Sequence, residues 1–121
     1  MSEWHGTVLG EPASKANSRQ LKWNFKAKRN FLVKSDKAIA YRVSALEQIK
    51  PPATPILGDV SLTAKIFYAS RRPDLDESLI MDILQEAGVI KNDRQIKIKH
   101  IYWGLDKANP RSILRVKERS L

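Results

Sequence analysis

The sequence predicts an α+β domain, a small mixed β-sheet with two principal helices. Alternating apolar and polar residues at 60–68 indicate a strand with one buried face. Apolar residues at helical spacing over 35–49 and 76–88 indicate two helices. The 121 residues contain no repeat or low-complexity block, so we expect a single domain over residues 1–121.

The composition favours a polyanionic partner. Lys and Arg number 22 against 13 acidic residues, which gives a formal net charge of +9. This excess is typical of nucleic-acid-binding proteins, although a basic solvated surface would give the same count. The absence of cysteine excludes a disulfide framework and a cysteine zinc site, and it fits a reducing compartment. Since we recognise no secretory signal, membrane span or basic amphipathic helix, we expect a cytoplasmic protein with no membrane role.

The amino-terminal third is expected to hold two short strands, at 7–9 and 31–33, around a polar loop. The loop, residues 11–28, has proline, serine and asparagine near its start. It mixes basic residues with Trp23 and Phe25, a combination that suits phosphates and exposed bases. The same two rings would equally fit the core of an early strand, because their spacing is two. The predicted phosphate contacts of the loop are Lys15, Arg19, Lys22, Lys26 and Lys28.

The first helix is expected to begin at Ser35, whose hydroxyl suits the N-cap position. Asp36 is favourable in the first turn, and Pro51 ends the helix. Apolar residues at helical spacing predict its buried face. They are Ile39, Val43, Leu46 and Ile49.

The remaining elements alternate between strand and helix. The second helix should begin near Asp76, bury an apolar stripe and end at Gly88, a good left-handed stop. Strands at 96–103 and 112–117 complete the sheet. The predicted buried face of the strand at 60–68 is Leu62, Ala64, Ile66 and Tyr68. The predicted stripe of the second helix is Leu79, Ile80, Ile83, Leu84 and Ala87.

Two carboxylates mark the start of the second helix. If the chain is extended through Leu75, Asp74 and Asp76 point to the same side, roughly 6 to 7 Å apart. Such a pair repels unless a cation or a proton relieves it, and Mg²⁺ binds hard oxygen ligands of this kind. An ion held there would activate water for phosphodiester cleavage. The alternatives are an N-cap role for Asp76 and a salt bridge between Asp74 and Arg71. We expect Arg71 and Arg72 to neutralise the carboxylates or to grip a phosphate.

The order of these motifs resembles the RusA family of Holliday-junction resolvases. The family pattern is Asp-x-Asp at a helix start, an Asp–aliphatic pair within that helix, and a D-D-x-Q-like turn before a strand. In this chain the pattern reads Asp74-Leu75-Asp76, Asp82-Ile83 and Asn92-Asp93-Arg94-Gln95. The upstream proline–polar loop and the helix that follows it also resemble the family, so the resemblance covers nearly the whole chain.

The resemblance implies a RusA-like fold and a homodimeric endonuclease dependent on Mg²⁺ or Mn²⁺. Such an enzyme resolves four-way DNA junctions by paired symmetric nicks. The resemblance also implies that Asp74, Asp76 and Asp93 are the catalytic metal ligands. Asp82 matches the family too, but it lies on another face of the helix. A supporting position beside the ion, a capping role and ligation all stay open for it.

Three positions depart from the family pattern, and one of them is Asn92, which stands where the family has the first Asp of its D-D pair. Glu77 stands where the family has Asn, and Ser78 or Leu79 stands where it has a lysine thought to assist catalysis. One alternative is therefore a non-catalytic nucleic-acid-binding protein that keeps the fold. Another is a basic RNA-binding or ribosome-associated structural protein, in which the acidic residues have no joint role.

Overall fold

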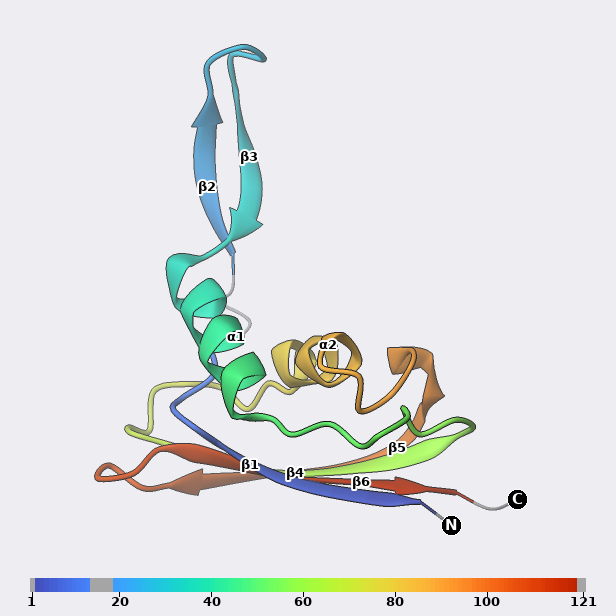
Figure 1. Cartoon of the computed structure of the whole chain (residues 1–121). Coiled ribbons are helices and arrows are strands. Elements are labelled where there is room, and N and C mark those ends of the chain that lie inside the picture. Colours follow the sequence, from blue (N-terminus) through green and yellow to red (C-terminus); the bar gives the residue numbers. More distant parts are fainter. Residues whose placement is uncertain (1, 14–18, 120–121) are drawn as a thin grey trace.

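A four-stranded mixed sheet with both helices on one face forms the centre of this computed structural model (Figure 1). The structure describes residues 2–13 and 19–119. The strand order is β1-β6-β4-β5, with β4 parallel to β5 and antiparallel to β6. The predicted α+β class is therefore confirmed. The strands are β1 (Glu3–Leu9), β4 (Val60–Tyr68), β5 (Ile96–Leu105) and β6 (Arg111–Glu118).

Strand β4 lies in the interior of the sheet, and its alternation decides which side chains form the core. Leu62, Ala64 and Ile66 are completely buried, since every second residue points to the helix-covered face. Tyr68 continues the same row and is also completely buried. The predicted buried face of this strand is thus confirmed.

Helix α2 (Ser78–Glu86) packs its apolar stripe on the sheet and ends where predicted. Gly88 adopts a φ of +85°, a left-handed conformation that favours glycine. The Gly88 N–H donates to the Gln85 carbonyl at 3.2 Å, and the Val89 N–H donates to the Leu84 carbonyl at 3.0 Å. This pair of bonds satisfies carbonyls of the last turn. The buried stripe is Leu79, Ile80, Ile83 and Leu84, as predicted.

Helix α1 (Asp36–Gln48) begins as predicted but buries a different face. The Ser35 hydroxyl accepts a hydrogen bond from the Ala38 N–H at 3.2 Å, which caps the first turn. The prediction that Ile39 and Val43 belong to the core is wrong, because they are 44% and 47% exposed. Small side chains on the buried face let the helix approach its neighbours closely. The buried residues are Ala38, Tyr41 and Ala45, and the predicted Leu46 and Ile49 also pack against the core.

Residues 19–34 form a two-stranded antiparallel hairpin, which we call the arm. Its strands are β2 (Arg19–Asn24) and β3 (Arg29–Lys34). The arm stands beyond the amino-terminal end of α1, away from the sheet (Figure 1). The predicted strand at 31–33 is confirmed as part of β3.

The predicted loop over 11–28 is wrong over residues 19–24, which form β2, whereas residues 25–28 are a turn. Residues 14–18 of that loop lie outside the described residues. An apolar alternation marks a strand only when one of its faces is buried. Leu21 and Trp23 of β2 are exposed, so the alternation of apolar residues along this strand does not correspond to a buried face.

The face of the sheet opposite the helices has no covering element in the described part of the chain (Figure 1). We call it the open face. Its side chains alternate with the buried ones along β1, β4 and β6. The residues of its central part are Glu3, His5 and Thr7, Ser61, Thr63 and Lys65, His100 and Tyr102, and Ile113, Arg115 and Lys117.

Candidate nucleic-acid and metal sites

One tyrosine and one tryptophan hold the loop that follows β4, which we call the acidic loop (69–77). The Tyr68 hydroxyl donates to the Asp74 carbonyl at 3.2 Å and accepts from the Asp76 N–H at 3.4 Å. The Trp103 ring stacks on Tyr68 with 6.1 Å between centroids, and its Nε1–H donates to the Pro73 carbonyl at 3.3 Å. Strands β4 and β5 therefore position the backbone that carries the two aspartates.

The two carboxylates of the acidic loop have different environments. Asp74 is exposed, whereas Asp76 retains only 8% exposure. The Oδ1 atom of Asp76 accepts a hydrogen bond from the Ser78 N–H at 3.0 Å. It thereby satisfies a donor of the first turn of α2 that has no partner within the helix. The N-cap residue of α2 is Glu77, whose side chain makes no capping hydrogen bond, so the N-cap alternative for Asp76 is wrong. Asp74 is the accessible carboxylate.

Asp93 lies at the opposite end of α2. Its backbone N–H donates to Gln85 Oε1, in the last turn of the helix, at 2.9 Å, whereas Asp76 precedes the first turn. A nine-residue helix rises roughly 12 Å from its first residue to its last, too far for both carboxylates to touch one ion at about 2.1 Å. Within 2–13 and 19–119, no three acidic or histidine side chains form a group that could hold a metal ion. The structure does not bring Asp93 to the Asp74–Asp76 pair.

The turn that contains Asp93 has a structural explanation. It is a short 3-10 helix, η2 (Asp93–Gln95), immediately before β5. Gln95 Oε1 accepts from the Asn92 N–H at 2.8 Å, and its Nε2 donates to the carbonyls of Ile56 and Gly58 at 2.8 and 2.7 Å. The glutamine of the D-D-x-Q-like motif thus ties the start of β5 to the loop that precedes β4.

The remaining predicted residues near this motif are exposed. Asp82 lies on the solvent side of α2. Arg71 and Arg72 form no ion pair with any acidic side chain that the structure describes, so the expected Arg71–Asp74 salt bridge is not observed. Both guanidinium groups are accessible to an anion.

Sequence reasoning missed two ion pairs that flank the acidic loop. Glu11 Oε2 accepts from the Ala69 N–H at 3.1 Å, and Lys37 Nζ lies 3.7 Å from Glu11 Oε1. On the other side, Lys99 Nζ of β5 lies 3.0 Å from Glu77 Oε1. No local pattern could indicate these pairs, because folding brings together residues that are far apart in the chain. They place two lysines at this end of the molecule, although α2 itself has none.

The pKa of Tyr68 reports the charge at this end of β4. Burial is the main cause that raises this pKa above its ordinary value, and the hydrogen bond from the Asp76 N–H opposes the shift. The negative charges of Asp76, Glu11 and Glu77 raise it further. Three carboxylates therefore surround the hydroxyl that anchors the acidic loop.

The tip of the arm carries two exposed aromatic rings. Trp23 is 49% exposed and Phe25 is 84% exposed, with 6.4 Å between centroids in an edge-on arrangement. The interpretation of these rings as core residues is therefore wrong. Lys28 at the tip has a φ of +52°, a conformation that a lysine rarely adopts.

Three of the predicted phosphate contacts have no side chain in the described part of the structure. Lys15 lies outside the described residues. Arg19 and Lys22 belong to the backbone of β2, and their side chains lie outside the described part of the structure. Lys26 and Lys28 are exposed in the turn between the two strands, where a phosphate can reach them.

A comparison with protein-family models finds none that matches this chain, and a comparison with curated proteins finds no relative. The resemblance to the RusA family thus stays a prediction from its motifs. No helix in the described ranges is long and apolar enough to span a membrane.

Proposed function

We propose that this chain is a homodimeric, Mg²⁺- or Mn²⁺-dependent endonuclease of the cytoplasm that binds four-way DNA junctions and nicks two symmetric strands. The arm is the observation that carries the proposal. It presents two exposed rings and basic residues away from the body, on a chain of net charge +9. The order of motifs that resembles the RusA family supports the same function.

The arm is suited to a junction because a junction offers both phosphates and incompletely stacked bases. Lys26, Lys28 and Arg29 are exposed around the tip and would contact phosphates. Trp23 and Phe25 would stack on bases at the crossover, an interaction that tolerates any sequence because every base has a flat face. The arm therefore favours recognition of DNA structure over DNA sequence.

Asp74 and Asp76 are the residues that would hold the metal ion. Mg²⁺ prefers hard oxygen ligands and is commonly bound through one or two carboxylates together with substrate phosphates, so this pair fits it. When bound, the ion supplies an activated water and neutralises charge on the phosphate. Arg71 and Arg72 lie in the same loop and would hold the phosphate through charge-assisted hydrogen bonds.

The substitution Asp74→Asn tests this proposal. We expect the wild-type protein to nick a synthetic four-way junction when Mg²⁺ is added, and the variant to lose nicking. Binding of the junction should persist or tighten, because the substitution removes a negative charge that faces phosphate. Asp59→Asn is the matched control, since it removes the same charge next to the amino end of β4 and should nick like the wild type.

A second candidate is a nucleic-acid-binding protein without nuclease activity. It is favoured by the hydrogen bond that Asp76 Oδ1 already accepts from the Ser78 N–H and by the position of Asp93 at the far end of α2. Junction binding without nicks in wild-type protein, in either Mg²⁺ or Mn²⁺, would support this candidate. Full nicking by the Asp74→Asn protein would refute the acidic loop as the site, and the absence of any junction preference would refute both candidates.

The homodimer is proposed because a two-fold junction presents the same surface twice, and two nicks need two sites. The exposed Ile39 and Val43 of α1 offer apolar surface for a contact between copies. Light scattering of the protein bound to a junction should give the mass of two chains per junction. One chain per junction at micromolar protein would contradict the dimer.

A further inference from the structure

The open face of the sheet is a second basic surface, separate from the arm and from the acidic loop. Neighbouring strands bring its side chains into rows that cross the whole sheet. One row consists of His5, Arg115, Thr63 and His100. The next row consists of Thr7, Ile113, Lys65 and Tyr102.

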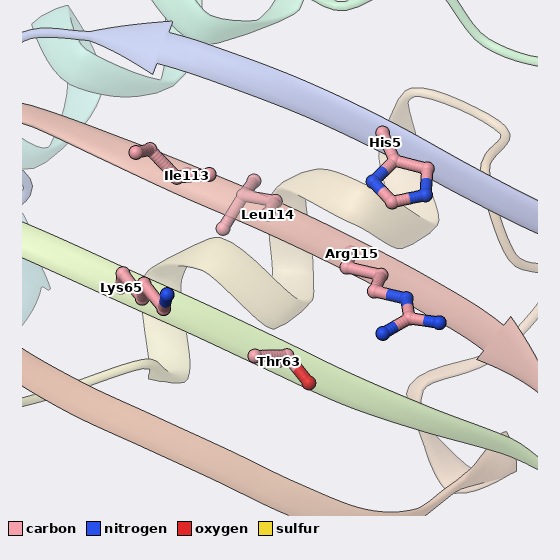
Figure 2. Close-up of a pocket in the computed structure, with 6 residues that line it drawn as sticks. All are labelled: His5, Thr63, Lys65, Ile113, Leu114 and Arg115. Atoms are coloured by element: carbon pink, nitrogen blue, oxygen red, sulfur yellow. The ribbon is translucent and has the colours of Figure 1, made fainter.

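Five residues of these two rows, together with Leu114, line a hollow of about 230 Å³ in the open face (Figure 2). Figure 2 shows Arg115 of β6 between His5 of β1 and Thr63 of β4. The polar groups of the lining are cations or can donate hydrogen bonds, and no carboxylate belongs to it. Such a lining fits an anion. The residues that line the hollow are His5, Thr63, Lys65, Ile113, Leu114 and Arg115.

The acidic residue nearest to the hollow is already paired. Glu3 accepts a hydrogen bond from Arg115 and lies 3.4 Å from His5 Nε2. Lys65 and Lys117 form no ion pair with an acidic residue in the described ranges. The open face therefore keeps positive charge that the protein itself does not neutralise.

We propose that the open face binds the phosphate backbone of a second DNA segment while the arm binds the first. The inference rests on the proposed function only in taking DNA as the ligand, and it does not require cleavage. Tyr102, which is 52% exposed beside Lys65, supplies a ring for contact with a sugar or an unstacked base. Charge complementarity selects a polyanion over a second copy, because a two-fold contact would set Lys65 and Arg115 against their own equivalents.

The double variant Lys65→Gln/Arg115→Gln tests the inference. The measurement is the slope of log affinity against log salt concentration, for a four-way junction and for a linear duplex. We expect the slope to fall by about 2 units, since each lost phosphate contact removes roughly 0.9. The control Lys50→Gln/Lys91→Gln removes the same charge from exposed positions off the open face, and its slope should stay at the wild-type value.

An unchanged slope in a double variant with the wild-type unfolding midpoint would overturn the inference. A change in the mass of the DNA-free protein, with no change in slope, would also overturn it and would assign the open face to a second copy. Wild-type protein that binds the linear duplex as tightly as the junction, together with a lower slope in the double variant, would refute the proposed function but support DNA binding by the open face. If wild-type protein binds neither DNA, both fail.

Discussion

The body and the arm differ in how much of each strand is buried. In the body, one face of β4 is sealed under two helices, and Leu62, Ala64 and Ile66 have no exposure. In the arm, two strands pair only with each other, and the rings of Trp23 and Phe25 face solvent. A lone two-stranded hairpin is at best marginally stable in water. The body therefore supplies the stability of the fold, whereas the exposed rings of the arm add little to it and are available for binding.

The largest expected effect is in the core of the body. Ile66→Ala should lower the free energy of unfolding by about 2 to 5 kcal/mol, because it removes buried methyl groups and leaves a cavity. Urea denaturation measures the change. Ile113→Ala, on the open face of the neighbouring strand β6, is the control and should cost much less, because Ile113 is exposed. Equal losses in the two variants would show that the two faces of the sheet do not differ as described.

A second effect in the body depends on pH. Burial raises the pKa of Tyr41 to about 12. A hydrogen bond between the hydroxyl groups of Tyr41 and Ser112 opposes this shift, but only in part. Because the unfolded chain releases this proton near pH 10 and the folded chain holds it, stability should fall as pH rises from 10 to 12. The fall is on the order of 2 to 3 kcal/mol. Tyr41→Phe should remove the part of the fall that Tyr41 causes, whereas Tyr68, whose pKa is also raised by burial, should keep its own part; unfolding experiments at pH 9 and 11.5 measure the difference.

The control for this measurement is Tyr102→Phe, since Tyr102 is exposed on the open face. That variant should keep the loss of stability at high pH. If Tyr41→Phe loses stability as steeply as the wild type, the buried hydroxyl is not the group responsible.

The smallest expected effect on stability is in the arm. Trp23→Ala should change the free energy of unfolding by less than about 0.5 kcal/mol, because the ring packs on no part of the core. It should weaken junction binding by about 1 to 3 kcal/mol if the ring stacks on a base. Denaturation and a binding titration on the same preparation separate the two quantities. A loss of about 3 to 5 kcal/mol in stability is the effect of truncating a core aromatic, and it would show that Trp23 is part of a core.

The parts of the fold that could be predicted from the sequence are those with a local physical cause. The alternation of β4 and the stop at Gly88 are of this kind, since each depends on the preferences of a few adjacent residues. The buried face of α1 is not of this kind. Ala38 and Ala45 face the core because their small side chains let the helix lie close to its neighbours, whereas Ile39 faces solvent. The arm could not be placed from the sequence, because the alternation of Leu21, Trp23 and Phe25 predicts a buried strand face, whereas all three side chains are exposed.

The candidate site also has a part that the sequence predicts and a part that depends on the tertiary structure. The D-x-D spacing places Asp74 and Asp76 on one loop, and adjacency along the chain is enough to establish that. Whether Asp93 joins them depends on the direction of α2, which sets Asp93 beside Gln85 at its far end. Glu11 reaches the loop only because the end of β1 leads the chain to the carboxyl end of β4.

The sequence by itself determined the α+β class, the capped start of α1 at Ser35, the core face of β4 and the basic character of the chain. These properties follow from local preferences and from composition, which need no knowledge of distant neighbours. Only the tertiary structure decided that basic residues of the arm and of the open face lie on separate surfaces, and that Asp93 does not join Asp74 and Asp76. The reason is that these arrangements depend on contacts between residues far apart in the chain, and such contacts form only when the sheet and its helices pack together.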